Sequence, residues 1–124
     1  MKNLYVIVFA SLFLAVASAG AEPLSVEKGK ANAVIVITEE APRSTRLAAA
    51  ELQMTIEKIS GAKLPIESKP GEGISIFIGE SKHLEKLGVT AKGLEHGAYR
   101  IKSGENWLAL IGDDTDFVPD RKST

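Results

Sequence analysis

Apolar residues recur with a helical period between Arg46 and Gly61. Four of them follow one another at spacings of four, four and three, namely Ala48, Leu52, Ile56 and Ile59. These intervals place the four side chains on one side of an α-helix. Pro42 suits the first helical position, with Ser44 as an alternative N-cap, and Gly61 suits the left-handed position that ends a helix. The pattern therefore predicts one amphipathic helix that packs through a single apolar side.

Five short segments outside this helix have the pattern of β-strands. Residues 33–37 form a continuous run rich in β-branched side chains, which is typical of a strand buried on both faces. Pro65 removes a backbone donor, so it places its strand at a sheet edge or lies at a strand start. The predicted strands are residues 33–37, 64–67, 74–78, 98–102 and 107–111. A second, short helix is expected over residues 81–87, with Gly88 after it.

These elements predict an α+β fold of two layers. The expected sheet is small and mixed, with about four to five strands, and carries the main helix and the short second helix on one face. The last strand is apolar on both sides: Leu108 and Leu110 point one way, and Trp107, Ala109 and Ile111 point the other way. Since one or two helices leave part of such a sheet uncovered, we expect the Trp107 side to contact another domain or a ligand.

The first residues have the features of an export signal. Lys2 precedes an apolar run that small residues close near Ala19, and the run is shorter than the about 20 residues that a membrane span needs. We expect a signal peptide over residues 1–19, with cleavage after Ala19 or Ala21. The remaining chain then divides into a lead-in at 20–32, one domain at 33–119 and a tail at 120–124. The exported product is expected in the periplasm or outside the cell, without membrane contact.

The composition and charge of the chain bear on how it is stabilised and on which partners it can bind. The chain has no cysteine, so an exported product must be held together by its core instead of by disulfides. Its formal net charge is −1, and no basic patch or stripe is visible. Nucleic acid is therefore not an expected partner.

Several polar clusters are candidates for chemistry, but none has a complete pattern. Asp113, Asp114 and Asp116 offer carboxylates to a cation, but the glycine and glutamate of an EF-hand loop are missing. Residues 79–81 (Gly-Glu-Ser) match half of a nucleophile elbow, and His83 stands where that motif needs glycine. We expect solvated turns at both places, and we expect no catalytic residue, no cofactor and no metal site.

Two further groups are candidates for binding. Arg43 and Arg46, near the helix start, either bind a carboxylate of a uronic acid or a neighbouring domain, or form a solvated helix face. Most aromatic rings after the signal lie in predicted strands, so we expect no exposed aromatic platform for sugars. Trp107 is the exception, and packing in the core or between domains is its alternative role.

Four short motifs follow one another along the chain. They are Ala-Ala-Glu-Leu-Gln at 49–53, Ile-Ser-Gly-Ala-Lys-Leu-Pro-Ile at 59–66, Ile-Phe-Ile-Gly-Glu-Ser at 76–81 and Leu-Ile-Gly-Asp-Asp at 110–114. Together they resemble the amino-terminal domain shared by alpha-glucuronidases, bacterial beta-hexosaminidases and related secreted proteins. The resemblance covers about residues 30–118, although the first motif lacks the spacer residue that the family has.

The resemblance implies a small α/β domain that precedes a catalytic barrel. In that family the catalytic acids lie in the barrel, so no catalytic residue is carried over to this sequence. The family continues for a long stretch after the position of Pro119, whereas this chain ends at Thr124, so we expect a truncated or fragmentary product. The expected function is that of a non-catalytic accessory domain of an exported carbohydrate-active enzyme. The alternative is a free-standing secreted module that binds a glycan or a protein.

Overall fold

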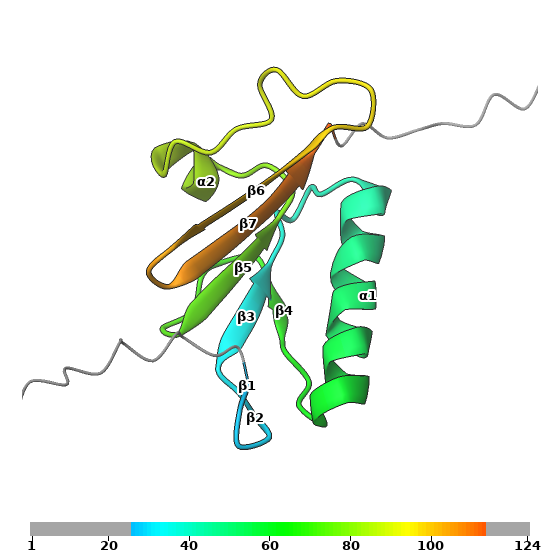
Figure 1. Ribbon diagram of the computed structural model, residues 1–124, viewed down its shortest axis with the longest axis vertical. Coiled ribbons are helices and arrows are strands. Elements are labelled where there is room, and N and C mark those ends of the chain that lie inside the picture. The colour runs from blue at the N-terminus through cyan, green and yellow to red at the C-terminus, as the bar shows by residue number, and fades with distance from the viewer. Residues whose placement is uncertain (1–25, 114–124) are drawn as a thin grey trace, which may run out of the picture.

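The computed structural model describes residues 26–113, which form a five-stranded mixed sheet with a helix on each face (Figure 1). The strand order is β4 (Ile66–Glu67), β3 (Ala33–Val36), β5 (Ile74–Ile78), β7 (Trp107–Gly112) and β6 (Tyr99–Gly104). The first four strands are parallel, and β6 is antiparallel to β7. This architecture confirms the predicted α+β class. The expected signal peptide at 1–19 and the expected tail at 120–124 lie outside the described residues.

Two crossovers of the same hand join the parallel strands β3, β4 and β5. The chain passes from β3 through α1 (Arg43–Ser60) to β4 on one face of the sheet. The connection from β4 to β5 returns across β3 on the other face, where a Cβ on Gly71 would lie 3.3 Å from Cγ1 of Val34. After β5 the chain passes through α2 (Lys82–Lys86) on that second face and enters β6, which runs antiparallel to its neighbour β7 and leads into it through a hairpin. Since direction and face change together, the hand is conserved, as the twist of parallel strands requires.

Helix α1 begins and ends close to the residues that the sequence indicates. Pro42 is the N-cap and not the first helical residue as expected, so α1 starts one residue later, at Arg43, without a side-chain capping bond. Gly61 ends the helix in the left-handed conformation with φ of 77°, and its N–H donates to the Glu57 carbonyl at 2.8 Å. A residue with a side chain would be strained at this φ, so the glycine stop is a property of the backbone.

The side of α1 that packs on the sheet differs from the predicted stripe. The buried line consists of Thr45 and Ala49, with Leu52 and Ile56 half-buried beside them. Two residues of the expected stripe are exposed: Ala48 faces an open part of the sheet, and Ile59 is 81% exposed. The helix is rotated because the small side chains of Thr45 and Ala49 allow its axis to approach the sheet closely.

The sheet separates two apolar cores. The α1 core joins Ile35, Leu64 and Ile76 with Ala49, and Gln53 closes it by donating from Nε2 to the Leu64 carbonyl at 2.7 Å. The second core lies on the opposite face. It contains Val34, Val36, Phe77, Leu84, Val89, Ala109 and Ile111. Leu84 comes from α2, so the short helix covers the face opposite α1, not the same face as predicted (Figure 1).

The structure corrects two expectations, one for the lead-in and one for the last two strands. Residues expected to be an irregular lead-in contain a small hairpin, β1 (Val26–Glu27) with β2 (Lys30–Ala31). Its two turn residues, Lys28 and Gly29, both have positive φ, which is the conformation that two-residue hairpin turns favour. The last hairpin extends further than predicted, because β6 continues to Gly104 and β7 to Gly112. Within residues 26–113, neither helix has both the length and the apolar character that crossing a bilayer requires.

Two isoleucines test the observed position of α1. Ile35 is fully buried, so Ile35→Ala is expected to lower the free energy of unfolding by about 2–5 kcal/mol. Ile59→Ala, the matched change at an exposed position, is expected to cost less than about 0.5 kcal/mol. Urea denaturation measures both. A large loss of stability in Ile59→Ala would support the apolar stripe predicted from the sequence and contradict the observed rotation of the helix.

Candidate functional site

The three apolar residues of β7 that were expected at an interface face the α2 side of the sheet. Ala109 and Ile111 are buried there by α2 and the loop after it, with 0% and 3% of their surface exposed. Neither side chain is open to a further domain. Trp107 is half-buried at the start of the strand, so only this member of the group keeps surface for an outside contact.

Trp107 has a clear partner within the chain. It pairs with Gly104 across the β6–β7 hairpin. A Cβ atom on Gly104 would collide with Nε1 and Cε2 of the indole, so the ring lies over the glycine backbone. An aromatic ring that covers a glycine in this way shields the hairpin backbone from water. Packing within the hairpin therefore accounts for the position of Trp107.

The two arginines at the start of α1 lie far from this group. Arg43 and Arg46 are both exposed, and they belong to the face of the sheet opposite Trp107. Arg46 donates from Nη1 to the Ala41 carbonyl and thereby holds the loop that leads into the helix. The structure therefore divides the predicted contact residues between two separate surfaces.

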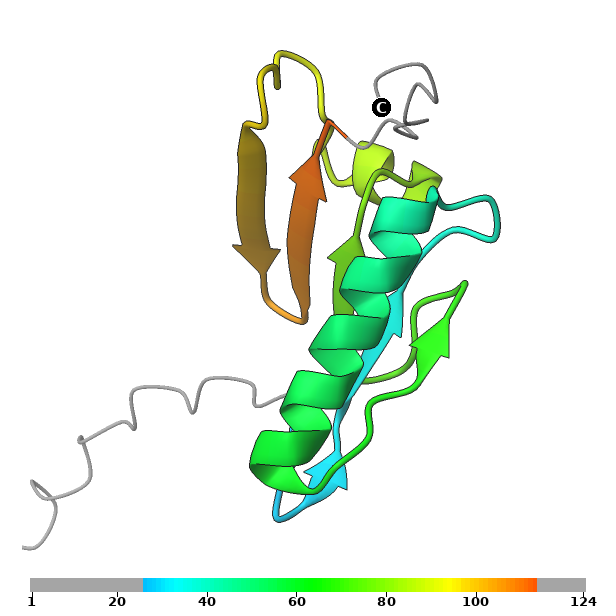
Figure 2. The same cartoon turned by 90° about the vertical axis from the view of Figure 1, so that its right-hand side faces the viewer.

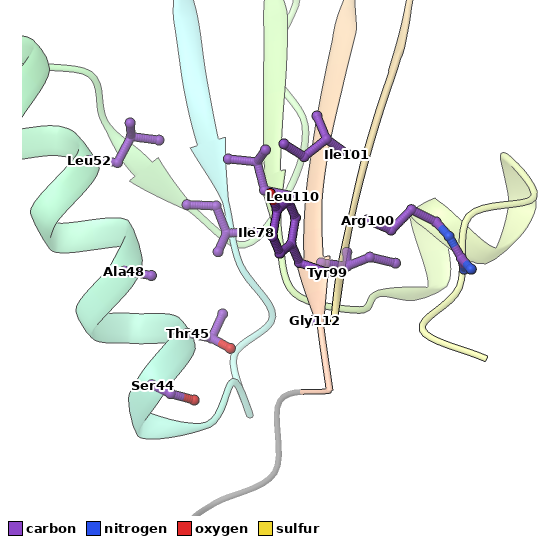
Figure 3. Close-up of a pocket in the computed structure, with 11 residues that line it drawn as sticks. Ser44, Thr45, Ala48, Leu52, Ile78, Tyr99, Arg100, Ile101, Leu110 and Gly112 are labelled. Carbon is purple, nitrogen blue, oxygen red and sulfur yellow. The ribbon is translucent and has the colours of Figure 1, made fainter. Parts of the chain in front are cut away.

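A different apolar surface is open on the α1 side, and we call it the open groove. It is a hollow of about 370 Å³ between α1 and the β6–β7 hairpin. In Figure 3, Thr45, Ala48 and Leu52 project from the helix toward the strands. The strands contribute Ile78, Tyr99, Ile101 and Leu110 to the opposite wall. Arg100 points away from the hollow in the same view.

The position of α1 explains why this groove exists. Figure 2 shows the helix in front of β3 and β5, with β6 and β7 uncovered beside it. A helix is about 10 Å wide and strands are about 4.8 Å apart, so one helix covers little more than two strands. The sequence predicted that one face of β7 would be uncovered, but it indicated the wrong face. The Leu110 side of β7 remains open, not the Trp107 side.

Large apolar side chains are exposed along the groove. Tyr99 is 74% exposed and Ile101 is 59% exposed, and Ile101 pairs with the half-buried Leu110. The expectation that strand aromatics would be hidden is therefore wrong for Tyr99. The alternation of apolar and polar residues in β6 predicts that this strand has an apolar face. It does not predict whether another element covers that face.

A second, polar hollow lies where the parallel strands end, and we call it the carboxyl-edge crevice. It has a volume of about 780 Å³. It is lined by Val36 and Ile37, by the loops after β3, β4 and β5, and by α2. The polar side chains that line it are Thr38, Glu39, Glu40, Ser68, Lys69, Glu80, Ser81, Lys82, His83 and Glu85. Most of these residues carry no motif, so sequence patterns gave no signal for the crevice.

Ser81 has a structural role at this edge. Its Oγ accepts a hydrogen bond from the Leu84 N–H at 3.2 Å and so caps α2. His83, the residue that breaks the nucleophile-elbow pattern, is exposed and packs its ring 6.3 Å from that of Phe77. His96, in the following loop, pairs with Glu95 at 3.8 Å on the surface. None of these contacts joins a histidine to the serine hydroxyl.

Charged groups in the described part of the chain lie at the surface. From Lys28 to Asp113, every charged side chain except that of Arg100 is exposed. Arg100 donates to the Thr90 carbonyl, and from Nη2 to the Lys92 carbonyl at 3.5 Å, so it ties β6 to the loop after α2. No three His, Cys, Asp or Glu side chains among residues 26–113 converge as metal ligands would. Asp114 and Asp116 of the acidic cluster lie outside the described residues.

Changing Ser81 separates a capping role from a chemical one. Ser81→Ala removes the acceptor for the Leu84 N–H and is expected to lower the free energy of unfolding by about 0.5–2 kcal/mol. Ser81→Asp keeps an acceptor at the N-cap and is expected to retain nearly full stability. Urea denaturation of both variants measures the difference. Equal losses in the two variants would contradict the capping role.

Changing Gly104 tests the position of Trp107. Gly104→Ala is expected to displace the indole, to shift its fluorescence to longer wavelength and to lower stability by about 1–3 kcal/mol. The chain has a single tryptophan, so the emission reports this residue alone. Ser103→Ala, on the other side of the same strand, is the control and should leave the spectrum unchanged. An unchanged spectrum in Gly104→Ala would show that the ring does not cover the glycine.

No family model, no curated protein and no solved structure matches this chain. What the protein does must therefore follow from its own residues, and above all from the open groove and the carboxyl-edge crevice.

Proposed function

We propose that this chain is a non-catalytic accessory domain of an exported carbohydrate-active enzyme, and that the open groove packs against the catalytic barrel of that enzyme. The observation that carries the proposal is the exposed apolar wall formed by Tyr99 and Ile101. Soluble proteins rarely leave a contiguous apolar patch of more than a few hundred Å² in water, and larger patches usually mark an interaction surface.

The course of the chain favours a partner that follows in the same polypeptide. β7 ends at Gly112, and Gly112 itself lines the groove. A domain connected after Asp113 would therefore start beside the apolar wall, and a short connection would be enough to bring the two together. Tethering of this kind raises the effective concentration of one surface at the other.

The surroundings of the charged side chains favour a catalytic centre elsewhere. Catalytic acids and bases are usually set in clefts where burial and neighbouring charges adjust them. In residues 28–113 the carboxylates, lysines and histidines are all exposed. The carboxyl-edge crevice holds several of them, but their side chains remain in contact with water.

The carbohydrate and export parts of the proposal come from the sequence. The four motifs between residues 49 and 114 resemble those of an amino-terminal domain that precedes glycoside-hydrolase barrels. The apolar run and small residues before Ala21 have the pattern of an export signal. Both properties agree with a domain that stiffens the start of a secreted enzyme.

Ile101 provides the test. The chain alone is compared with the full product of its gene, in which the proposal places a catalytic barrel after this domain. Ile101→Lys is expected to lower the free energy of unfolding of the longer protein by at least about 2 kcal/mol, because a side chain buried at the domain interface is lost. In the chain alone the same change should cost less than about 0.5 kcal/mol, because Ile101 is exposed there.

The matched control is Ile59→Lys, which changes another exposed isoleucine outside the groove and should be harmless in both proteins. Urea denaturation gives the stabilities, and hydrolysis of aryl glycosides should appear only in the longer protein. A downstream sequence without a barrel would overturn the proposal. An Ile101→Lys variant that is harmless in both proteins would also overturn it.

A further inference from the structure

We infer that the open groove receives one amphipathic α-helix from the polypeptide that follows this domain, and that this helix lies beside α1 across β7 and β6. The inference rests on the proposed function, because that proposal places a further domain after this one. It goes beyond a contact with a barrel, since it names the element that makes the contact and the direction in which that element runs.

The uncovered part of the α1 face has the width of one helix. α1 lies in front of β3 and β5, and β7 and β6 follow β5 in the strand order (Figure 2). Strands lie about 4.8 Å apart and a helix is about 10 Å wide, so two strands accommodate one helix. A second sheet would have to pack about 10 Å above the whole face, and α1 already occupies that layer. A partner in the groove therefore has to be a narrow element.

The side of α1 that borders the groove is suited to close packing with another helix. Ser44, Ala48 and Leu52 all line the hollow and follow one another at intervals of four residues. Residues at this interval form a ridge, and helices pack by fitting such ridges into grooves at an axial distance of about 8–10 Å. The small side chains of Ser44 and Ala48 permit a close approach. A helix at this position would also bury Ala48, an apolar residue that the described part of the chain leaves exposed.

The strands supply an apolar wall whose spacing fits a helix. Tyr99 and Ile101 of β6 line the groove, and both are exposed. They are two residues apart, which is about 6.8 Å along an extended strand. Side chains four residues apart on a helix are separated by about 6 Å along its axis, so one helix can contact both. Of the described residues that line the groove, Arg100 alone is charged, and it points away (Figure 3). The side of the helix that faces the sheet is therefore expected to be uncharged.

The path of the chain fixes the direction of this helix. β7 ends at Gly112, which lines the groove and pairs with Tyr99. Polypeptide that continues from this end of the strand must turn back in order to cover the hollow. It then runs antiparallel to β7 and in the same direction as α1. This arrangement repeats that of β3, after which the chain turns back over the same face of the sheet as α1.

Single cysteines test whether both walls of the groove are covered, because the chain itself has none. Ala48→Cys and Ile101→Cys place one thiol on each wall, and both should react readily with an aryl disulfide reagent in the chain alone. In the full product of the gene both reactions should slow by about tenfold or more, because a buried thiol reacts only when its site opens. Ala50→Cys, at an exposed position of α1 outside the groove, is the matched control and should react equally in both proteins. The unsubstituted full product is the blank.

Proline distinguishes a helix from other elements. In the full product, Ile101→Lys should speed amide hydrogen exchange in one continuous segment after this domain, and that segment is the bound helix. A proline inside a helix removes a backbone hydrogen bond and breaks the helix. A proline at the centre of the segment should therefore restore the reactivity of Ala48→Cys, whereas an alanine at the same position should not.

The outcomes separate this inference from the proposed function. If Ile101→Lys destabilises the full product but the thiol of Ala48→Cys stays reactive, the domain contact stands and the helix is overturned. A strand added to the free edge of β6 would give this result. Protection of Ala48→Cys that survives the proline would also overturn the helix. Protection of both thiols in a gene product without a barrel would support the helix and overturn the proposed function, and reactive thiols at both positions would overturn both.

Discussion

One long helix cannot cover a sheet of five strands, and most features of this molecule follow from that limit. Helix α1 is about 10 Å wide, so it spans little more than two of the strands that lie about 4.8 Å apart. It packs over β3 and β5 and leaves the β6–β7 hairpin beside it uncovered (Figure 2). The opposite face is covered differently, by α2 and the loop after it, which bury Leu84, Val89 and Ile111. The open groove is therefore the part of the sheet for which the described residues supply no cover.

The same connections that distribute cover between the faces also make the polar crevice. Parallel strands require crossovers of one hand, and β4 lies on one side of β3 while β5 lies on the other. The chain after β3 leads to α1 and the chain after β5 leads to α2, so the two leave the sheet on opposite faces and a hollow opens between them. The apolar groove and the polar crevice therefore occupy different parts of one sheet.

The sequence predicted the elements well, because their signals are local. The helix stop at Gly61 depends on one backbone conformation, and the alternation in β5 depends on neighbouring residues. The placement of Pro65 beside a two-residue edge strand was predicted for the same reason.

Tertiary features were not predictable in this way. The rotation of α1, which buries Ala49 and exposes Ile59, depends on how closely the helix approaches the sheet. The face covered by α2 and the burial of Ile111 depend on the path of the chain between β5 and β6, which periodicity does not report. For the candidate site, the expected residues were divided between two faces. Tyr99 and the crevice residues became visible only in the folded chain.

The two edges of the sheet also differ in what they offer to a second molecule. β4 is two residues long, whereas β6 presents six residues with Lys102 among them. Among the strands of residues 26–113, only β6 offers a long free edge to another copy, so pairing of two such edges would close after two chains instead of growing into a fibre.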